Sequence, residues 1–216
     1  MKSIVILDFG SLFTQKIKHA FDRWFITSYI VPHNISLEEI MEIKPYGIVF
    51  SGSPDMLSEN IRYGRENPED LKAEPIHDVP ARRPHPGIYN LEIPILGICY
   101  GHQLIAEHFG VKIEKSPKPE YSKDEGMYTF HVLEDSPLFE GLPREFPVYM
   151  AHGDYVPQLP EGFTLLGKTD KTPIGAFQKG HIFGVQFHPE ADEDGISKQV
   201  LRNFADYAFQ VKIYDE

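Results

Sequence analysis

The sequence predicts an α/β protein built on an open, mostly parallel, twisted sheet with helices on both faces. In the first half of the 216-residue chain, short apolar runs alternate with segments of helical periodicity, which is the pattern of a parallel sheet covered by its crossover helices. The stretch Glu92–Phe109 then places an apolar run, one cysteine between two glycines and a helical segment in immediate succession. That combination is typical of a strand turning sharply into a helix. At 41% apolar residues, we expect residues 1–216 to form a single domain.

The first elements follow from their periodicity. Ser3–Asp8 is a short apolar run, as expected of a strand buried on both faces. Ser36 with Glu39 three residues later forms a capping box, which predicts a helix running to about Ile43. The other expected elements here are a helix over Leu12–Trp24, strands over Phe25–Val31, Tyr46–Phe50 and Ile93–Ile98, and a helix from about His102.

Residues 55–90 break this alternation. The segment is polar and contains five prolines, so we expect a loop with at most a helical turn at Pro68–Ala73. A loop of this length inside a compact domain is typical of a lid or a docking surface. His77 and His85 lie in it but have no further ligands at a suitable spacing, so no metal site is predicted.

The second half predicts a small antiparallel β excursion and a final helix over Ile196–Val211. Lys179-Gly180 is a tight turn between two strands. Ala151–Asp154 is expected to follow a strand end, and Asp135–Pro143 to be a surface connection. The expected strands are Phe146–Met150, Phe163–Leu166, Ile174–Gln178 and His181–Phe187, after a β-like stretch over Val111–Val132 with turn residues at Ser116, Pro117, Pro119 and Gly126.

Cys99 is the candidate nucleophile. It lies in Gly97-Ile98-Cys99-Tyr100-Gly101, and glycines at the flanking positions let backbone and neighbouring strands approach closely. A thiol at a helix N-terminus is favoured as the thiolate. An isolated cysteine is more often an inert buried residue, but the strand–glycine–helix context favours the nucleophile.

A nucleophilic thiol needs a base and an acceptor that orients the base. His188 follows the apolar run IFGVQF at the predicted strand rim, and Glu190 lies two residues later. We therefore expect Cys99, His188 and Glu190 to act together. Backbone N–H groups of Tyr100 and Ser53 are the expected donors to an oxyanion. His102 and His108 are weaker candidates for the base because they lie on the elbow's own helix.

Bulk properties exclude several classes of function. The net charge of −11 argues against broad binding to nucleic acid or anionic membranes. No apolar run of about 18 residues is present for a membrane span. A single cysteine and the absence of a signal-peptide pattern predict a cytoplasmic location.

The motifs GICYGHQ, VQFHPE and SGSP together resemble the class I, or triad, glutamine amidotransferase family. LDFGSLFTQKI, YMAHGDYV and LPEGF are similar to the glutaminase domain of GMP synthetases. The resemblance implies that Cys99 forms a γ-glutamyl thioester from L-glutamine. It also implies substrate contacts, which would come from Gly52, Gln103, Tyr121, Ala151, His152 and Gly153. Ser53 stands where the family has a second glycine, Ser122 replaces a glycine after Glu120-Tyr121, and Tyr149 replaces a tryptophan.

The resemblance implies no cofactor, and a synthetase that receives ammonia. Because no Gly-rich phosphate loop is present, that ATP-dependent synthetase is expected to be a separate chain. Two alternatives stay open: a stand-alone cysteine hydrolase of γ-glutamyl compounds, and a catalytically idle regulatory or binding subunit with the same fold.

Overall fold

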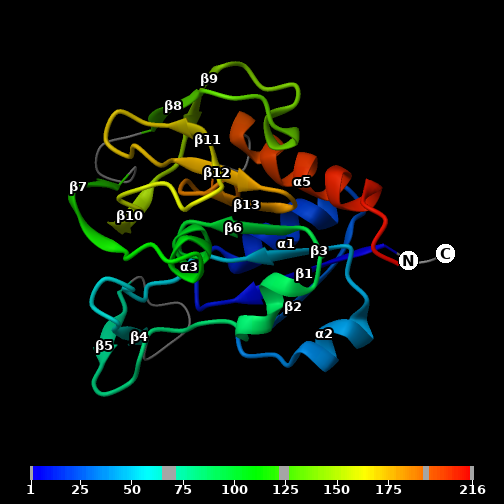
Figure 1. Ribbon diagram of the computed structural model, residues 1–216, viewed down its shortest axis with the longest axis horizontal. Coiled ribbons are helices and arrows are strands. Elements are labelled where there is room, and N and C mark those ends of the chain that lie inside the picture. Colours follow the sequence, from blue (N-terminus) through cyan, green and yellow to red (C-terminus); the bar gives the residue numbers. More distant parts are fainter. Residues whose placement is uncertain (1, 65–71, 122–126, 192–194, 215–216) are drawn as a thin grey trace.

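The computed structural model describes residues 2–64, 72–121, 127–191 and 195–214 (Figure 1). Its main feature is a nine-stranded sheet in the order β2-β1-β3-β6-β13-β12-β11-β8-β9. Pairing is parallel from β2 to β13 and antiparallel from β13 to β9. The predicted fold class is confirmed, and most of the antiparallel strands continue the main sheet. Its strands are β1 (Ser3–Asp8), β2 (Thr27–Pro32), β3 (Gly47–Phe50), β6 (Ile95–Ile98), β8 (Tyr128–Val132), β9 (Glu145–Val148), β11 (Thr164–Lys168), β12 (Ala176–Lys179) and β13 (Ile182–Val185).

The two faces of the sheet carry separate apolar cores. Helices α1 (Thr14–Arg23) and α5 (Gln199–Gln210) pack in one, and α2 (Leu37–Ile43) and α3 (Tyr100–His108) in the other. Strand β1 serves both because successive side chains point to opposite faces. Ile4 and Ile6 enter the first core, while Val5 and Leu7 enter the second. A continuous apolar run is therefore required for β1.

Local sequence patterns account for several boundaries. The Ser36 capping box is present, with Ser36 Oγ accepting from the Glu39 N–H at 3.2 Å and Glu39 Oε2 accepting from the Ser36 N–H at 3.0 Å. The helix after the elbow begins at Tyr100, two residues earlier than expected, because the backbone turns entirely at Cys99. No described helix has the length and apolar character needed to cross a membrane.

The prediction that residues 55–90 form only a loop is wrong. The segment contains a short hairpin of β4 (Arg62–Gly64) and β5 (Glu74–Ile76), followed by the 3-10 helix η1 (Pro86–Asn90). The helical turn expected at Pro68–Ala73 falls mainly outside the described residues. Prolines and short strands hid this hairpin from a periodicity analysis.

A second two-stranded sheet pairs β7 (Glu114–Tyr121) with β10 (Ala151–Tyr155). Two expectations are wrong here: Ser116, Pro117 and Pro119 lie within a strand rather than a turn, and Ala151–Asp154 is itself a strand. Prolines are tolerated in β7 because a strand of a two-stranded sheet has a free edge. Gly126 is outside the described residues.

The expectation that Asp135–Pro143 is only a surface connection is wrong. This segment contains the 3-10 helix η2 (Pro137–Phe139), whose Leu138 and Phe139 are buried. The final helical segment is divided into the 3-10 helix η3 (Ile196–Lys198) and α5. Figure 1 labels α5 near the end of the chain.

The carboxyl ends of β1, β3, β6 and β13 define one rim of the parallel sheet, where ligands bind in such folds. Phe9, Ser51, Cys99 and His188 follow these strands. In Figure 1 the start of α3, the β4–β5 hairpin and the β7–β10 pair lie on the same side of the molecule, opposite the end of α5. This side holds the residues singled out by the sequence.

Candidate active site

Cys99 occupies a strained position between β6 and α3. Its φ and ψ are 52° and −100°, a conformation that non-glycine residues rarely adopt. The neighbouring glycines are required: a Cβ on Gly97 would lie 2.4 Å from the Gly101 carbonyl oxygen, and one on Gly101 would lie 2.6 Å from Phe50 Cβ. The Cys99 N–H donates to the Val185 carbonyl at 2.8 Å, which anchors the turn to β13.

The thiol is buried but borders a cavity. Cys99 is 4% exposed, and its Sγ lies 3.7 Å from the Ala151 carbonyl oxygen on β10. As the N-terminal cap of α3 it lies at the positive end of the helix dipole. That location favours a thiolate and provides free N–H groups near the sulfur.

His188 and Glu190 form a buried pair at the end of β13. Glu190 Oε1 lies 2.8 Å from His188 Nδ1. The side chain of His188 is 5% exposed and that of Glu190 is 0% exposed. The His188 N–H donates to the Tyr149 carbonyl at 2.8 Å, and the Phe13 ring packs edge-on against the imidazole with centroids 5.2 Å apart. These contacts hold the ring in one orientation.

Burial by itself would lower the pKa of His188. The negative charges of Cys99 and Glu190, together with hydrogen bonds to both, instead raise this pKa well above 6.5. The arrangement therefore favours the imidazolium form of His188, next to the sulfur of Cys99.

The turn after β3 is held to the end of β1 by hydroxyl groups. The Ser53 Oγ donates to the Phe9 carbonyl at 2.7 Å and accepts from the Asp55 N–H at 3.0 Å, while Ser51 Oγ accepts from the Phe9 N–H at 3.0 Å. Ser53 is not among the described residues with positive φ, so serine is accommodated here without backbone strain. A Cβ on Gly52 would lie 3.0 Å from His188 Cε1, so glycine lets the imidazole approach this turn.

A cavity of about 450 Å³ is bounded by the elbow, the turn after β3, β7 and β10. Cys99 lines it together with six of the other predicted site residues: Ser53, Tyr100, Gln103, Ala151, His152 and Gly153. Gly52, His188 and Glu190 are not in the lining. Tyr121 is placed by its backbone pairing with Ala151 across the β7–β10 sheet. The inserted segment contributes Asp55, Met56, Tyr63 and Ala73 to the wall.

Two predicted substrate contacts have their side chains turned into the protein. Gln103 Nε2 donates to the Asp154 carbonyl at 2.9 Å and lies 3.3 Å from Gln186 Oε1. His152 Nδ1 lies 2.9 Å from the same Asp154 carbonyl, and its Nε2 lies 3.5 Å from Glu120 Oε2. Both side chains therefore hold β10 in place through the Asp154 carbonyl. Their polar groups are used within the protein, although both residues border the cavity.

Sequence reasoning missed the buried polar cluster behind β10. Glu120, fully buried, accepts hydrogen bonds from the hydroxyls of Thr169 and Thr172. Burial raises the pKa of Glu120, but hydrogen bonds from His152, Thr172 and Thr169 outweigh it and lower the pKa below 4.5. The partners come from three separate parts of the chain, so no local motif could have identified them.

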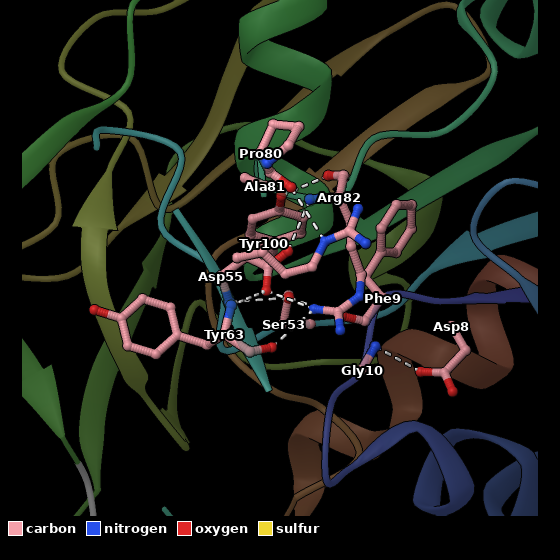
Figure 2. A network of polar contacts seen from close by, with 12 residues as sticks. Asp8, Phe9, Gly10, Ser53, Asp55, Tyr63, Pro80, Ala81, Arg82 and Tyr100 are labelled. Carbon is pink, nitrogen blue, oxygen red and sulfur yellow. Dashed lines mark hydrogen bonds and ion pairs between the residues drawn. The ribbon is translucent and has the colours of Figure 1, made fainter. Parts of the chain in front are cut away.

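Sequence patterns also gave no sign of an ion pair between Asp55 and Arg82, which Figure 2 shows beside the turn that holds Ser53. The pair joins the first residue of the inserted segment to a residue in its last third. Neither residue lies in a helix or strand, so periodicity could not indicate it.

His102 and His108, the weaker candidates for the base, each stack on an aromatic ring. His102 stacks on Phe177 with centroids 4.4 Å apart, and burial, with a smaller effect of His152, lowers the pKa of His102 to about 3. His108 stacks on Tyr89 with centroids 3.8 Å apart. Within the described ranges, no three His, Cys, Asp or Glu side chains are grouped as metal ligands would be.

A parallel sheet that presents a strained cysteine at a strand–helix elbow, beside a buried His–Glu pair, defines an α/β protein of the cysteine nucleophile-elbow class. The family model for class-I glutamine amidotransferases matches residues 5–207. The chain belongs to this family.

Relatives agree with the family match. The chain is 37% identical over 207 residues to a GMP synthase [glutamine-hydrolyzing] of Campylobacter lari and 38% identical over 205 residues to that of Lactobacillus johnsonii. These alignments cover 95% and 94% of this chain but 36% and 35% of the relatives, so the chain spans about a third of their length.

Solved structures show the same fold. A Thermoplasma acidophilum protein described as a GMP synthase subunit superposes with a TM-score of 0.76 at 27% identity, covering 97% of this chain and 94% of that one. A glutamine amidotransferase from Thermotoga maritima superposes with a TM-score of 0.69 at 18% identity, covering 97% and 99% of the two chains, and supports the fold alone.

Proposed function

We propose that this chain hydrolyses the side-chain amide of L-glutamine and supplies the ammonia to a GMP synthetase. The observation that carries the proposal is the elbow thiol of Cys99 at a cavity of about 450 Å³, beside His188 with its raised pKa and its 2.8 Å bond to Glu190. Family membership and the GMP synthase relatives support the substrate and the acceptor.

The proposed reaction has two halves. The Cys99 thiolate attacks the amide carbon, and the resulting oxyanion accepts hydrogen bonds from the backbone N–H groups of Tyr100 and Ser53. His188 donates its proton to the departing nitrogen, the C–N bond breaks, and ammonia leaves a γ-glutamyl thioester. Water then attacks the thioester with His188 as base, releasing glutamate and restoring the thiolate.

Glu190 has a positioning role in this scheme. By holding Nδ1 of His188, it directs the other ring nitrogen toward Cys99 and stabilises the imidazolium. The amino-acid end of glutamine would lie against the Tyr121 backbone and residues Ala151–Gly153 of β10. Gln103 would act on that strand through its bond to the Asp154 carbonyl.

The test is ammonia release from glutamine by the purified protein, alone and with a GMP synthetase, with Cys99→Ala as the control. Release that disappears in the variant is expected. A glutamine-like diazoketone should label Cys99 faster than iodoacetamide at equal concentration. No release under either condition, together with no selective labelling, would contradict the proposal and favour a catalytically idle subunit.

A further inference from the structure

One ion pair within the inserted segment, between Asp55 and Arg82, lies next to the turn after β3. Arg82 Nη1 donates to Asp55 Oδ1 at 2.5 Å, and the Arg82 backbone N–H donates to Asp55 Oδ2 at 2.7 Å (Figure 2). The Tyr63 N–H adds a third bond to the same carboxylate at 2.9 Å. The Asp55 side chain is fully buried. A buried carboxylate held by three donors, one of them charged, has one well-defined position.

The same pair contacts the side chains of both residues whose backbone N–H groups are the expected oxyanion donors. On one side, the Asp55 N–H donates to Ser53 Oγ at 3.0 Å, and Ser53 Oγ donates to the Phe9 carbonyl at 2.7 Å. On the other side, the Arg82 carbonyl accepts from the Tyr100 hydroxyl at 2.6 Å. Tyr100 directly follows the cysteine. Each donor residue is therefore one hydrogen bond away from the Asp55–Arg82 pair.

The contact requires the shape of arginine. The guanidinium lies against the backbone at Gly10, where an added Cβ would be 3.4 Å from both Arg82 Cζ and Nη1. Arg82 Nη1 also donates to the Tyr63 carbonyl at 3.2 Å. A planar group with several fixed donors can make these contacts together, whereas the ammonium of lysine is a compact point charge.

We propose that Arg82 is a positioning residue that sets the backbone N–H groups of Ser53 and Tyr100 for the oxyanion, so that the 55–90 insertion contributes to the chemical step. The inference rests on the proposed glutamine hydrolysis. Such donors are effective only near 2.7–3.1 Å from the developing oxyanion. Small displacements therefore weaken transition-state binding more than ground-state binding.

Arg83 offers a matched control. It is the same residue type, one position along in the same segment, but it binds Glu107 through Nε and Nη2 at 2.7 Å each and Asn60 at 2.9 Å, and it makes no contact with Asp55 among the described hydrogen bonds. The variants Arg82→Met, Arg82→Lys and Asp55→Asn are compared with Arg83→Met for kcat and KM of ammonia release.

We expect kcat to fall by about tenfold or more in all three test variants, with KM changed less than about twofold, since loss of one oxyanion donor costs still more. Arg83→Met should retain wild-type kcat. The double variant Asp55→Asn with Arg82→Met should be no slower than the worse single variant, because both changes break the same contact.

Labelling of Cys99 separates positioning from general loosening. A glutamine-like diazoketone carries a carbonyl oxygen where the amide oxygen would lie, whereas iodoacetamide reports only on the thiol. Arg82→Met and Arg82→Lys should slow the first reaction and leave the second unchanged. An active wild-type protein with equal kcat in Arg82→Met and Arg83→Met would overturn the positioning role, as would a parallel loss of both labelling rates. A wild-type protein that neither releases ammonia nor labels selectively would instead overturn the proposed function.

Discussion

Among the described residues, two buried His–Glu pairs differ in their surroundings. In the pair at the end of β13, His188 lies 2.8 Å from Glu190 through Nδ1, and Glu190 Oε2 has no hydrogen-bond partner among the described residues. In the pair behind β10, Glu120 accepts from Thr169 and Thr172 as well as facing His152. In the first pair, one carboxylate oxygen accepts no hydrogen bond from the described residues and the imidazole lies beside a thiol. In the second pair, which we call the saturated cluster, both carboxylate oxygens accept hydrogen bonds.

The difference indicates separate roles for the same two residue types. An imidazole that faces a nucleophile can exchange a proton during a reaction. An imidazole bound between the Asp154 carbonyl, Thr172 and Glu120 has no free position for such an exchange, and it fixes the strand that lines the cavity. We therefore expect substitutions in the His188–Glu190 pair to lower activity more than stability, and substitutions in the His152–Glu120 pair to lower stability.

The largest expected effect is on activity. Replacing His188 with Gln removes the group that protonates the leaving nitrogen, so kcat for ammonia release should fall by at least about 10³-fold. The midpoint of thermal unfolding should fall less in His188→Gln than in Glu120→Gln. Ammonia release and circular dichroism melting check the two parts, and a variant that keeps more than a tenth of wild-type kcat would contradict the proposed base.

The next effect is on stability. Glu120→Gln replaces a buried carboxylate that accepts hydrogen bonds from the hydroxyls of Thr169 and Thr172. Each hydrogen bond to a charged group contributes about 1.5–3 kcal/mol, so weakening both should cost more than removing the single hydroxyl of Thr172. The free energy of unfolding in urea measures this loss. Glu190→Gln is the matched control, because it makes the same change in the pair whose second oxygen is unsatisfied. Equal losses of stability in the two variants would remove the distinction drawn between the pairs.

A smaller effect is expected from the hydroxyl beside Glu120. Thr172→Val keeps the shape of the side chain but removes its hydrogen bond to the carboxylate, which should cost about 1.5–3 kcal/mol of unfolding free energy. Thr164→Val, on the exposed end of β11, is the control and should be nearly neutral. Urea titrations of both variants test the assignment of Thr172 to the saturated cluster.

The two pairs also predict opposite pH responses. The pKa of Glu120 is lowered, so its contribution to stability is present above 4.5 and is lost as the pH falls through its lower folded value. The difference in unfolding free energy between wild type and Glu120→Gln should therefore shrink on acidification below 4.5. A difference that stays constant from neutral pH down to complete protonation would contradict the lowered pKa.

For His188 the sign is reversed. Its raised pKa gives a contribution that is present below 6.5 and is lost as the pH rises through the higher folded value. Cys99→Ala removes one of the two negative partners, so the pKa of His188 should fall in that variant. Imidazole NMR shifts followed against pH measure both values, and equal pKa values would exclude the coupling between Cys99 and His188.

Local patterns in the sequence determined much of this protein. The alternation of apolar and helical segments predicted the parallel half of the sheet, and the Ser36 capping box predicted the start of α2. The elbow at Cys99 and the spacing of His188 and Glu190 are also local, because a turn conformation or a contact between residues two apart depends mainly on nearby backbone.

Only the tertiary structure decided the contacts between distant segments. Glu120 meets His152 because β7 pairs with β10, and Asp55 meets Arg82 because the β4–β5 hairpin folds back on the turn after β3. Whether both oxygens of a buried carboxylate accept hydrogen bonds depends on which donors from distant segments lie beside it. Hydrophobic periodicity reports which face of an element is buried, but it carries no information about which polar groups meet there.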